Sequence, residues 1–253
     1  MYPYIRVFGR VIGTYGLCMT IGIALACILA FQKGRKQGTK LEDILIIGAF
    51  ALLGGLPSGA ILYAFVTFSP AQIWNSVLTG DFSVFGGLVF YGALIGGILG
   101  GLIGMSVVKC SFDLVEDSIV PFIPLGHGIG RIGCVMAGCC NGMPYDGPFA
   151  IYYPNSVAGL PSDQGYFPVQ LVEAVANLCI CGVLLWITRK GRKPGVLLSI
   201  YLCLYALTRF LLEFLRGDSI RGKYGLFSTS QWIAVLMVVC SITYILGNRR
   251  KNV

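Results

Sequence analysis

The stretch VIGTYGLCMTIGIALACILAFQKGRK, residues 11–36, decides the fold. No charged residue interrupts it from Val11 to Phe31, and a helix needs about 20 apolar residues to cross the hydrocarbon core of a bilayer. The basic residues Lys33, Arg35 and Lys36 follow at once. The apolar part is too long for a signal-peptide core and has no small-residue cleavage pattern. We therefore expect a retained transmembrane helix.

Similar apolar stretches recur along the chain. Hydrophobic residues make up 56% of the sequence and charged residues only 12%, compared with about 25% charged in soluble domains. The fold class we predict is an all-α polytopic membrane protein of about seven transmembrane helices in a single domain, residues 1–253. The expected spans lie near residues 11–31, 44–68, 85–108, 117–137, 168–188, 195–215 and 229–247, with an extracytoplasmic segment near 138–167.

The basic residues predict the orientation. They follow the first and fifth spans and end the chain, whereas residues 69–84 and 138–167 contain no Lys or Arg. Because cytoplasmic loops carry the excess of positive charge, we expect the N-terminus outside and the C-terminus in the cytoplasm. The net charge of +8 is spread over such short runs, which argues against a nucleic-acid partner. Arg216, Arg221 and Lys223 lie on the expected outer side, where attraction of an anion is one explanation.

Ionisable residues inside the spans are costly, roughly 2.5 to 3.5 kcal/mol each at the centre of a helix. His127 and Arg131 lie four residues apart, and Arg209 and Glu213 repeat that spacing, so each pair shares a helix face. Glu173 lies near the outer end of the fifth span, shortly after Pro168. Two interpretations remain open: internal ion pairs that join helices, or an anion site in which two guanidinium forks converge on a lipid phosphate.

The ten cysteines lie mostly in apolar segments. Cys134, Cys139 and Cys140 suggest metal ligation, but the chain has no CxxC pair and His127 is its only histidine. We therefore expect no metal here, and interpret the three as small packing residues or as partners in a disulfide. His127 itself is either a structural hydrogen-bond donor or a catalyst.

Four motifs together resemble one family. The strings GRIGCVMAGCCNG (130–142), FPVQLVEA (167–174), RFLLEFLR (209–216) and GLFSTSQ (225–231) occur in order, after Tyr15-Gly16 in the first span. In this order they are similar to the prolipoprotein diacylglyceryl transferase family, along nearly the whole chain.

The resemblance implies a catalytic membrane domain in the bacterial cytoplasmic (inner) membrane. It implies transfer of the diacylglyceryl group of phosphatidylglycerol to the lipobox cysteine thiol of a prolipoprotein, with release of glycerol phosphate and without a cofactor. The implied partners are phosphatidylglycerol, a prolipoprotein lipobox peptide and membrane lipid.

The resemblance and the positions of the charged residues together predict which residues form the site. As catalytic residues we expect Arg131, Arg209, His127 and Tyr91. As substrate-binding residues we expect Tyr15, Gly142, Gln170, Glu173, Glu213 and Arg216.

The chain also departs from the family pattern. GGLVFYGALIGG (86–97) has Tyr91 where the family has a histidine, and Cys134 and Cys139 replace an asparagine and an acidic residue. Val172 replaces a tyrosine and Gly217 a proline. Either His127 takes over proton removal or the arginine field suffices. Otherwise the chain is a paralogue with another acceptor, or a lipid-binding protein or transporter without catalysis.

Overall fold

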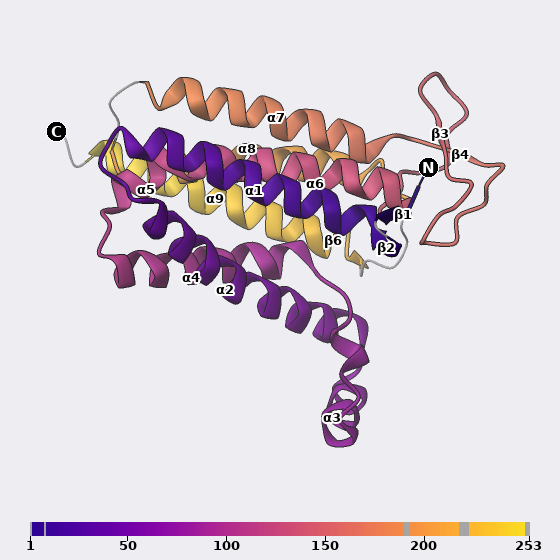
Figure 1. Ribbon diagram of the computed structural model, residues 1–253. Coiled ribbons are helices and arrows are strands. Elements are labelled where there is room, and N and C mark those ends of the chain that lie inside the picture. Colours follow the sequence, from indigo (N-terminus) through magenta and orange to yellow (C-terminus); the bar gives the residue numbers. More distant parts are fainter. Residues whose placement is uncertain (1, 8, 190–192, 218–222, 251–253) are drawn as a thin grey trace. The chain divides into compact units, whose positions relative to one another are not determined.

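The computed structural model describes residues 2–7, 9–189, 193–217 and 223–250. The chain forms two compact units, residues Met1–Lys33 with Glu116–Val253 (unit 1) and Gly34–Val115 (unit 2). Each is described separately below, and Figure 1 gives the order of the elements along the chain. Of the basic residues used to predict orientation, Lys190, Arg192, Arg221 and Lys251 lie outside the described residues.

Seven helical segments among the described residues are long and apolar enough to cross a membrane. This confirms the predicted class, an all-α polytopic membrane protein, while the orientation of the termini stays a prediction. The segments are α1 (Thr14–Arg35), α2 (Leu41–Thr67), α4 (Phe90–Val108), the broken segment Phe112–Ala137, α7 (Val169–Ile187), α8 (Val196–Glu213) and α9 (Thr229–Arg250), in which Thr229–Gly247 is the apolar part.

The fourth segment is the least regular. It consists of α5 (Phe112–Ser118), the 3-10 turn η2 (Val120–Phe122) and α6 (Ile123–Ala137). Pro121 and Pro124 lie at the joints, where a residue without a backbone N–H interrupts the helical hydrogen bonds. Half of the residues in its most apolar 18-residue stretch are buried, compared with 17% in the corresponding stretches of α1 and α9. Much of α6 is thus an interior helix, which is where polar side chains find partners.

Unit 1 is a bundle in which α6 packs on α7, α7 on α8, and α8 on α9 (Figure 1). A buried carboxylate caps one of these helices. Glu116 is 2% exposed, and its two oxygens accept hydrogen bonds of 2.8 Å from the backbone N–H groups of Gly195 and Leu198, at the start of α8. The negative charge meets the positive end of the helix dipole, so this cap fixes the beginning of α8.

Unit 2 is built on the pair α2 and α4, with α3 (Pro70–Thr79) and η1 (Phe82–Phe85) between them in sequence. The glycines of α4 recur every fourth residue, at Gly92, Gly96, Gly100 and Gly104. A Cβ added to Gly54 of α2 would lie 3.2 Å from the Cα of Gly100, so the two backbones are almost in contact. Small residues at a helix interface in a membrane let the backbones approach this closely.

The sequence reading missed the short elements outside the spans. Residues 69–84 were expected to be a loop, but Ser69 and Gln72 form a capping box that starts α3. The described residues also contain three antiparallel strand pairs. They are β1 (Tyr4–Val7) with β2 (Arg10–Gly13), β3 (Ile151–Tyr152) with β4 (Gly165–Tyr166), and β5 (Lys223–Tyr224) with β6 (Phe227–Ser228).

Candidate active site

Three helices of unit 1 carry polar side chains at a spacing of three or four residues, which puts each set on one helix face. Most of these side chains are buried, although they lie within apolar spans. Such groups persist in a membrane where they are paired, face a wet cavity or do chemistry. The sets are His127, Arg131 and Cys134 on α6; Gln170, Glu173 and Asn177 on α7; and Tyr201, Tyr205, Arg209 and Glu213 on α8.

Glu173 of α7 is the centre of the group. Its Oε1 lies 2.9 Å from Nη2 of Arg131 and 3.9 Å from Nε2 of His127, and the carboxylate side chain is 1% exposed. His127 and Arg131 therefore share one face of α6, as their spacing predicted. The interpretation of these charges as internal pairs between helices is correct for Arg131 and Glu173.

A second pair lies farther along α8. Nη2 of Arg209 is 2.6 Å from Oε2 of Glu213, the intrahelical contact that the four-residue spacing predicted. The other oxygen of Glu213 accepts a 2.8 Å hydrogen bond from the hydroxyl of Ser228. At the start of α9, the Ser228 N–H donates to the side-chain oxygen of Gln231, and the Gln231 N–H donates to the hydroxyl of Ser228. This reciprocal pair is a capping box. The GLFSTSQ motif thus begins α9 and holds the Glu213 carboxylate.

The two pairs belong to one charged group. The Glu173 carboxylate lies in the electrostatic field of Arg209 and Arg216 as well as that of Arg131. Each of the two intramembrane arginines nevertheless has a carboxylate of its own. Within the described part of the chain, the buried Nε of Arg131 and the buried Nη1 of Arg209 have no hydrogen-bond partner. Since an unsatisfied buried donor costs about 1–3 kcal/mol, and more when charged, these N–H groups are suited to an incoming anion.

Two tyrosines that the sequence reading missed lie beside His127. The ring of Tyr205 is 5.1 Å from the imidazole, centroid to centroid, and the ring of Tyr201 is 6.2 Å from that of Tyr205. Both tyrosines are completely buried. Their spacing of four residues, continued by Arg209, was the signal that would have found them.

Gln170 ties the loop after α6 to the start of α7. Its Nε2 donates 2.9 Å hydrogen bonds to the carbonyl of Cys139 and to the hydroxyl of Tyr153. Burial raises the pKa of Tyr153, which keeps its phenol neutral at ordinary pH. Tyr153 lies in the predicted extracytoplasmic segment and is a third tyrosine that the sequence analysis did not identify.

Gly142 has a packing reason for being glycine. A Cβ there would lie 3.0 Å from the Cβ of Phe167 and would overlap the carbonyl oxygen of the same residue. Gly142 pairs with Arg216 in an isolated antiparallel bridge, and Gly217 donates from its N–H to the carbonyl of Asn141 at 3.2 Å. This contact brings the half-buried Arg216 beside the loop that follows α6.

The remaining two predicted residues differ in their placement. Tyr15 begins α1 with 42% of its surface exposed, and it interacts electrostatically with Arg131 and Cys134. Its Cα would be 3.2 Å from a Cβ on Gly133, so α1 and α6 meet closely here. Tyr91 is buried at the start of α4, with its ring 6.1 Å from that of Phe90. It belongs to unit 2, which is described separately from the polar group of unit 1.

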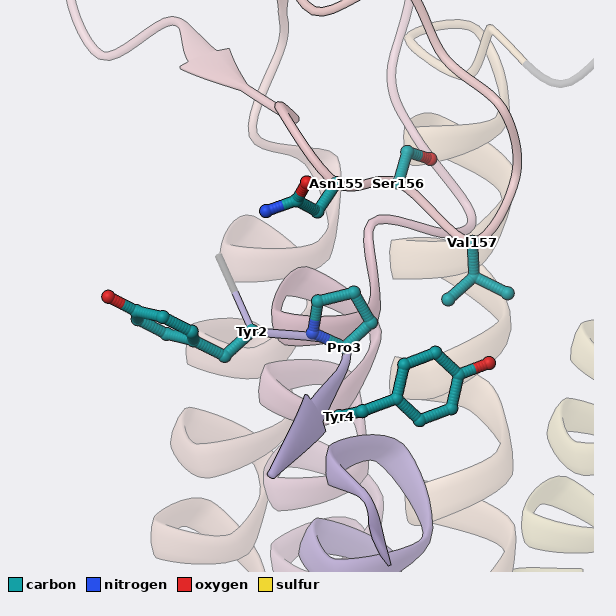
Figure 2. A pocket seen from close by; sticks show the side chains of 6 residues that line it. All are labelled: Tyr2, Pro3, Tyr4, Asn155, Ser156 and Val157. Atoms are coloured by element: carbon teal, nitrogen blue, oxygen red, sulfur yellow. The ribbon is translucent and has the colours of Figure 1, made fainter. Parts of the chain in front are cut away.

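An open hollow of about 530 Å³ lies elsewhere in unit 1. Figure 2 shows the side chains that line it, from Tyr2, Pro3 and Tyr4 on one side and from Asn155, Ser156 and Val157 on the other. The Thr14 N–H donates a 2.9 Å hydrogen bond to the Pro3 carbonyl and holds the N-terminal segment in place. None of the six residues is charged, so this hollow does not fit the predicted anion site.

Comparisons with known proteins agree over nearly the full length. The family model of prolipoprotein diacylglyceryl transferase matches residues 4–246. Phosphatidylglycerol--prolipoprotein diacylglyceryl transferase 2 of Clostridium perfringens is 33% identical over 250 residues, which cover 98% of this chain and 95% of that protein. The transferase of Clostridium tetani is 34% identical over 239 residues, 94% and 93% of the two chains. That of Bordetella bronchiseptica is 31% identical over 249 residues, again 94% and 93%.

The matches confirm the expectation drawn from the four motifs, while the roles of single residues stay predictions. By the family match over nearly its whole length, and with seven helices long and apolar enough to span a membrane, the chain belongs to the prolipoprotein diacylglyceryl transferase family.

Proposed function

We propose that this chain transfers the diacylglyceryl group of phosphatidylglycerol to the cysteine thiol of a prolipoprotein. The full-length likeness to transferases named for that reaction supports the proposal. The observation in the chain itself that carries it is the pair of buried arginines with unused N–H groups in a membrane-spanning bundle. A phospholipid headgroup offers the oxygens that such groups bind.

The reaction makes one bond and breaks one. The sulfur of the acceptor cysteine attacks the glyceryl carbon that bears the phosphate ester oxygen, and a C–S bond forms. The C–O bond breaks and glycerol phosphate leaves with the electron pair. The thiol proton passes to a base, because the thiolate is the nucleophile. Charge therefore grows on the phosphate oxygens as the bond breaks.

Arg131 and Arg209 are the residues we propose to stabilise that charge. Their N–H groups are held rigidly by Glu173 and Glu213, and preorganised donors in a dry site stabilise developing charge without reorganisation. The two carboxylates position the arginines and do not touch the lipid. Tyr15, beside Arg131, donates to the phosphate, and Arg216 attracts the anionic headgroup.

His127 is the base we propose in place of the family histidine. Its imidazole lies next to Arg131 and within 3.9 Å of Glu173, which can stabilise the imidazolium that forms. Tyr91, in unit 2, remains the second residue proposed for this step. Gln170 and Gly142 shape the loop that receives the substrates.

The acceptor and the membrane in which the protein lies are proposed from the same family resemblance. We propose that the acceptor is a lipobox peptide and that the protein spans the bacterial cytoplasmic membrane. The N-terminus would then lie outside, with residues 138–167 on the outer side, where secreted precursors emerge. The two contact units would work as a single catalytic domain.

Complementation tests the proposal. Cells depleted of their own transferase are given the wild-type chain, and lipidation of a reporter prolipoprotein is followed by its mobility and mass. Restored lipidation supports the function. The double variant Arg131→Lys and Arg209→Lys is the inactive control. If the wild-type chain inserts in the membrane at normal levels and the reporter stays unlipidated, the function is wrong.

A further inference from the structure

The end of α6 brings two cysteines together. Gly138 adopts a left-handed conformation with φ 69°, its N–H bonds to the carbonyl of Val135, and the N–H of Cys139 bonds to the carbonyl of Cys134 at 3.1 Å. This is the Schellman arrangement, in which the residue after the left-handed glycine contacts the last turn of the helix. Cys139 is therefore placed against Cys134, although five positions separate them.

The next residue adds a third sulfur. Cys140 has φ 57°, a backbone conformation that residues other than glycine, asparagine and aspartate rarely adopt. With this turn, the Sγ atoms of Cys134, Cys139 and Cys140 all lie within 4.8 Å of one another. All three are free thiols, with Cys134 buried and the other two partly buried. The disulfide that the sequence left open is not formed in this structure.

The spacing fits one small ion. Thiolates bind zinc at about 2.3 Å, so two sulfurs on the same tetrahedral ion lie about 3.8 Å apart. Side-chain shifts of less than about 1 Å would bring the three sulfurs to that distance. Arg131 and Arg216 act electrostatically on Cys140, so positive charge lies near the three sulfurs and favours thiolates.

We propose that Cys134, Cys139 and Cys140 form a binding site for a thiophilic metal ion, of the class of Cu⁺ or Zn²⁺. Soft thiolate ligands select these ions, and three of them leave a position open for water or another ligand. The chain lacks a CxxC pair, which argued against a metal, but the left-handed Gly138 and Cys140 fold the loop back on the helix and bring the three sulfurs together.

The site would fix the loop on which the substrate-binding prediction depends. Cys139 accepts from Gln170 through its carbonyl, and Gly142 follows two residues after Cys140. A metal here would hold the end of α6 and this loop as one rigid piece. The inference does not rest on the transferase reaction, because it is tested by metal binding alone.

The experiment uses the full chain in lipid nanodiscs, prepared under reducing conditions. Cd²⁺ is titrated as a spectroscopic probe through its thiolate charge-transfer absorption, and Zn²⁺ and Cu⁺ are then tested as competitors. In parallel, a membrane-permeant alkylating reagent is added with and without metal, and modified cysteines are located by mass spectrometry. We expect one metal per chain and protection of the three cysteines, whereas metal should leave the alkylation of Cys179 and Cys240, which lie outside the cluster, unchanged.

Cys140→Gly separates ligand loss from misfolding. Glycine favours the φ of this position, so the fold is kept, and we expect metal affinity to fall at least about 100-fold, the upper end of what loss of an outer-shell group costs. Cys179→Ser, on the same bundle, is the matched control and should bind as the wild type does. Wild-type affinity in Cys140→Gly, or equal alkylation of the three cysteines with and without metal, would overturn the proposal.

A disulfide is the remaining outcome. Two of the three cysteines would then resist alkylation in the protein as isolated and become reactive on reduction. If the reduced protein still takes up no metal, the cluster is a redox pair and the metal site is wrong. Competition by Cu⁺ alone or by Zn²⁺ alone identifies which ion the site prefers.

Discussion

The guanidinium of Arg131 on α6 and the carboxylate of Glu173 on α7 form an ion pair of 2.9 Å inside the bundle. The two side chains are 10% and 1% exposed, so both charges have left water. Removing two charges from water is costly, and the pair repays this cost only with good geometry. The transferases of this family are named for an anionic lipid, phosphatidylglycerol, and a buried arginine suits the binding of such a lipid. The costly buried pair therefore agrees with a role for Arg131 beyond joining helices.

The first prediction concerns the arginines. Arg131→Lys and Arg209→Lys should each lower kcat/KM for diacylglyceryl transfer by about 100-fold or more, because an ammonium cannot reproduce the planar fork and removing one preorganised donor costs about that factor. Rates measured with phosphatidylglycerol in nanodiscs check this. Arg35→Lys, at the exposed end of α1, is the matched control and should keep the wild-type rate. Wild-type turnover in either test variant removes its arginine from the mechanism.

The second prediction concerns His127. If its imidazole accepts the thiol proton, the wild-type rate rises with pH as that imidazole loses its proton, because only the neutral ring can act as the base. In His127→Ala this acid limb should vanish and the rate at neutral pH should fall about 100-fold, within the range for general-base catalysis. The measurement is the pH–rate profile of both proteins. A variant that folds, loses activity and keeps the wild-type profile would show that His127 only packs against Tyr205.

The third prediction concerns stability. Glu116 accepts two 2.8 Å hydrogen bonds from the start of α8, so Glu116→Ala should leave both N–H groups without this acceptor. We expect a loss of about 1.5–3 kcal/mol in the free energy of unfolding, the range for a charged hydrogen bond. Thermal unfolding in a fixed detergent measures it. Glu42→Ala, exposed in the first turn of α2, is the control, and an equal effect of the two substitutions would contradict the capping role.

The fourth prediction concerns Gly142. A methyl group there overlaps the backbone of Phe167, so Gly142→Ala should displace the loop and break its bridge to Arg216. We expect lower thermal stability together with lower activity. Gly182→Ala on α7 is the control, since nothing lies within 4 Å of an added Cβ and alanine favours the helix. A Gly142→Ala protein as stable as this control would show that the loop adapts.

The spans could be predicted from sequence because hydropathy is a local property. The placement of His127 and Arg131 on one face of α6, and the ion pair of Arg209 with Glu213 within α8, also followed from spacing alone. Tyr201 and Tyr205 have the same four-residue spacing, but a tyrosine in an apolar span is far less unusual than a charged residue and so is a weaker signal of a site. Each of these features depends on residue spacing within a single helix, which the sequence shows directly.

Other features could not be read because they join distant segments. Nothing in the spacing of α6 and α7 specifies that Arg131 meets Glu173, or that Ser228 holds Glu213. The convergence of the cysteines depends on two left-handed residues, Gly138 and Cys140, of which only the glycine is signalled by residue type. Backbone turns and helix contacts of this kind are set by packing.

One measurement tests the central claim most directly. The purified chain is incubated with phosphatidylglycerol and a synthetic lipobox peptide, and the peptide is analysed by mass spectrometry. The account predicts a diacylglyceryl group on the peptide's cysteine sulfur, with release of an equal amount of glycerol phosphate, and formation of this product about 100-fold or more slowly with Arg131→Lys. A peptide that stays unmodified with folded wild-type protein, or a modified one with the Arg131→Lys protein at the same rate, would contradict it.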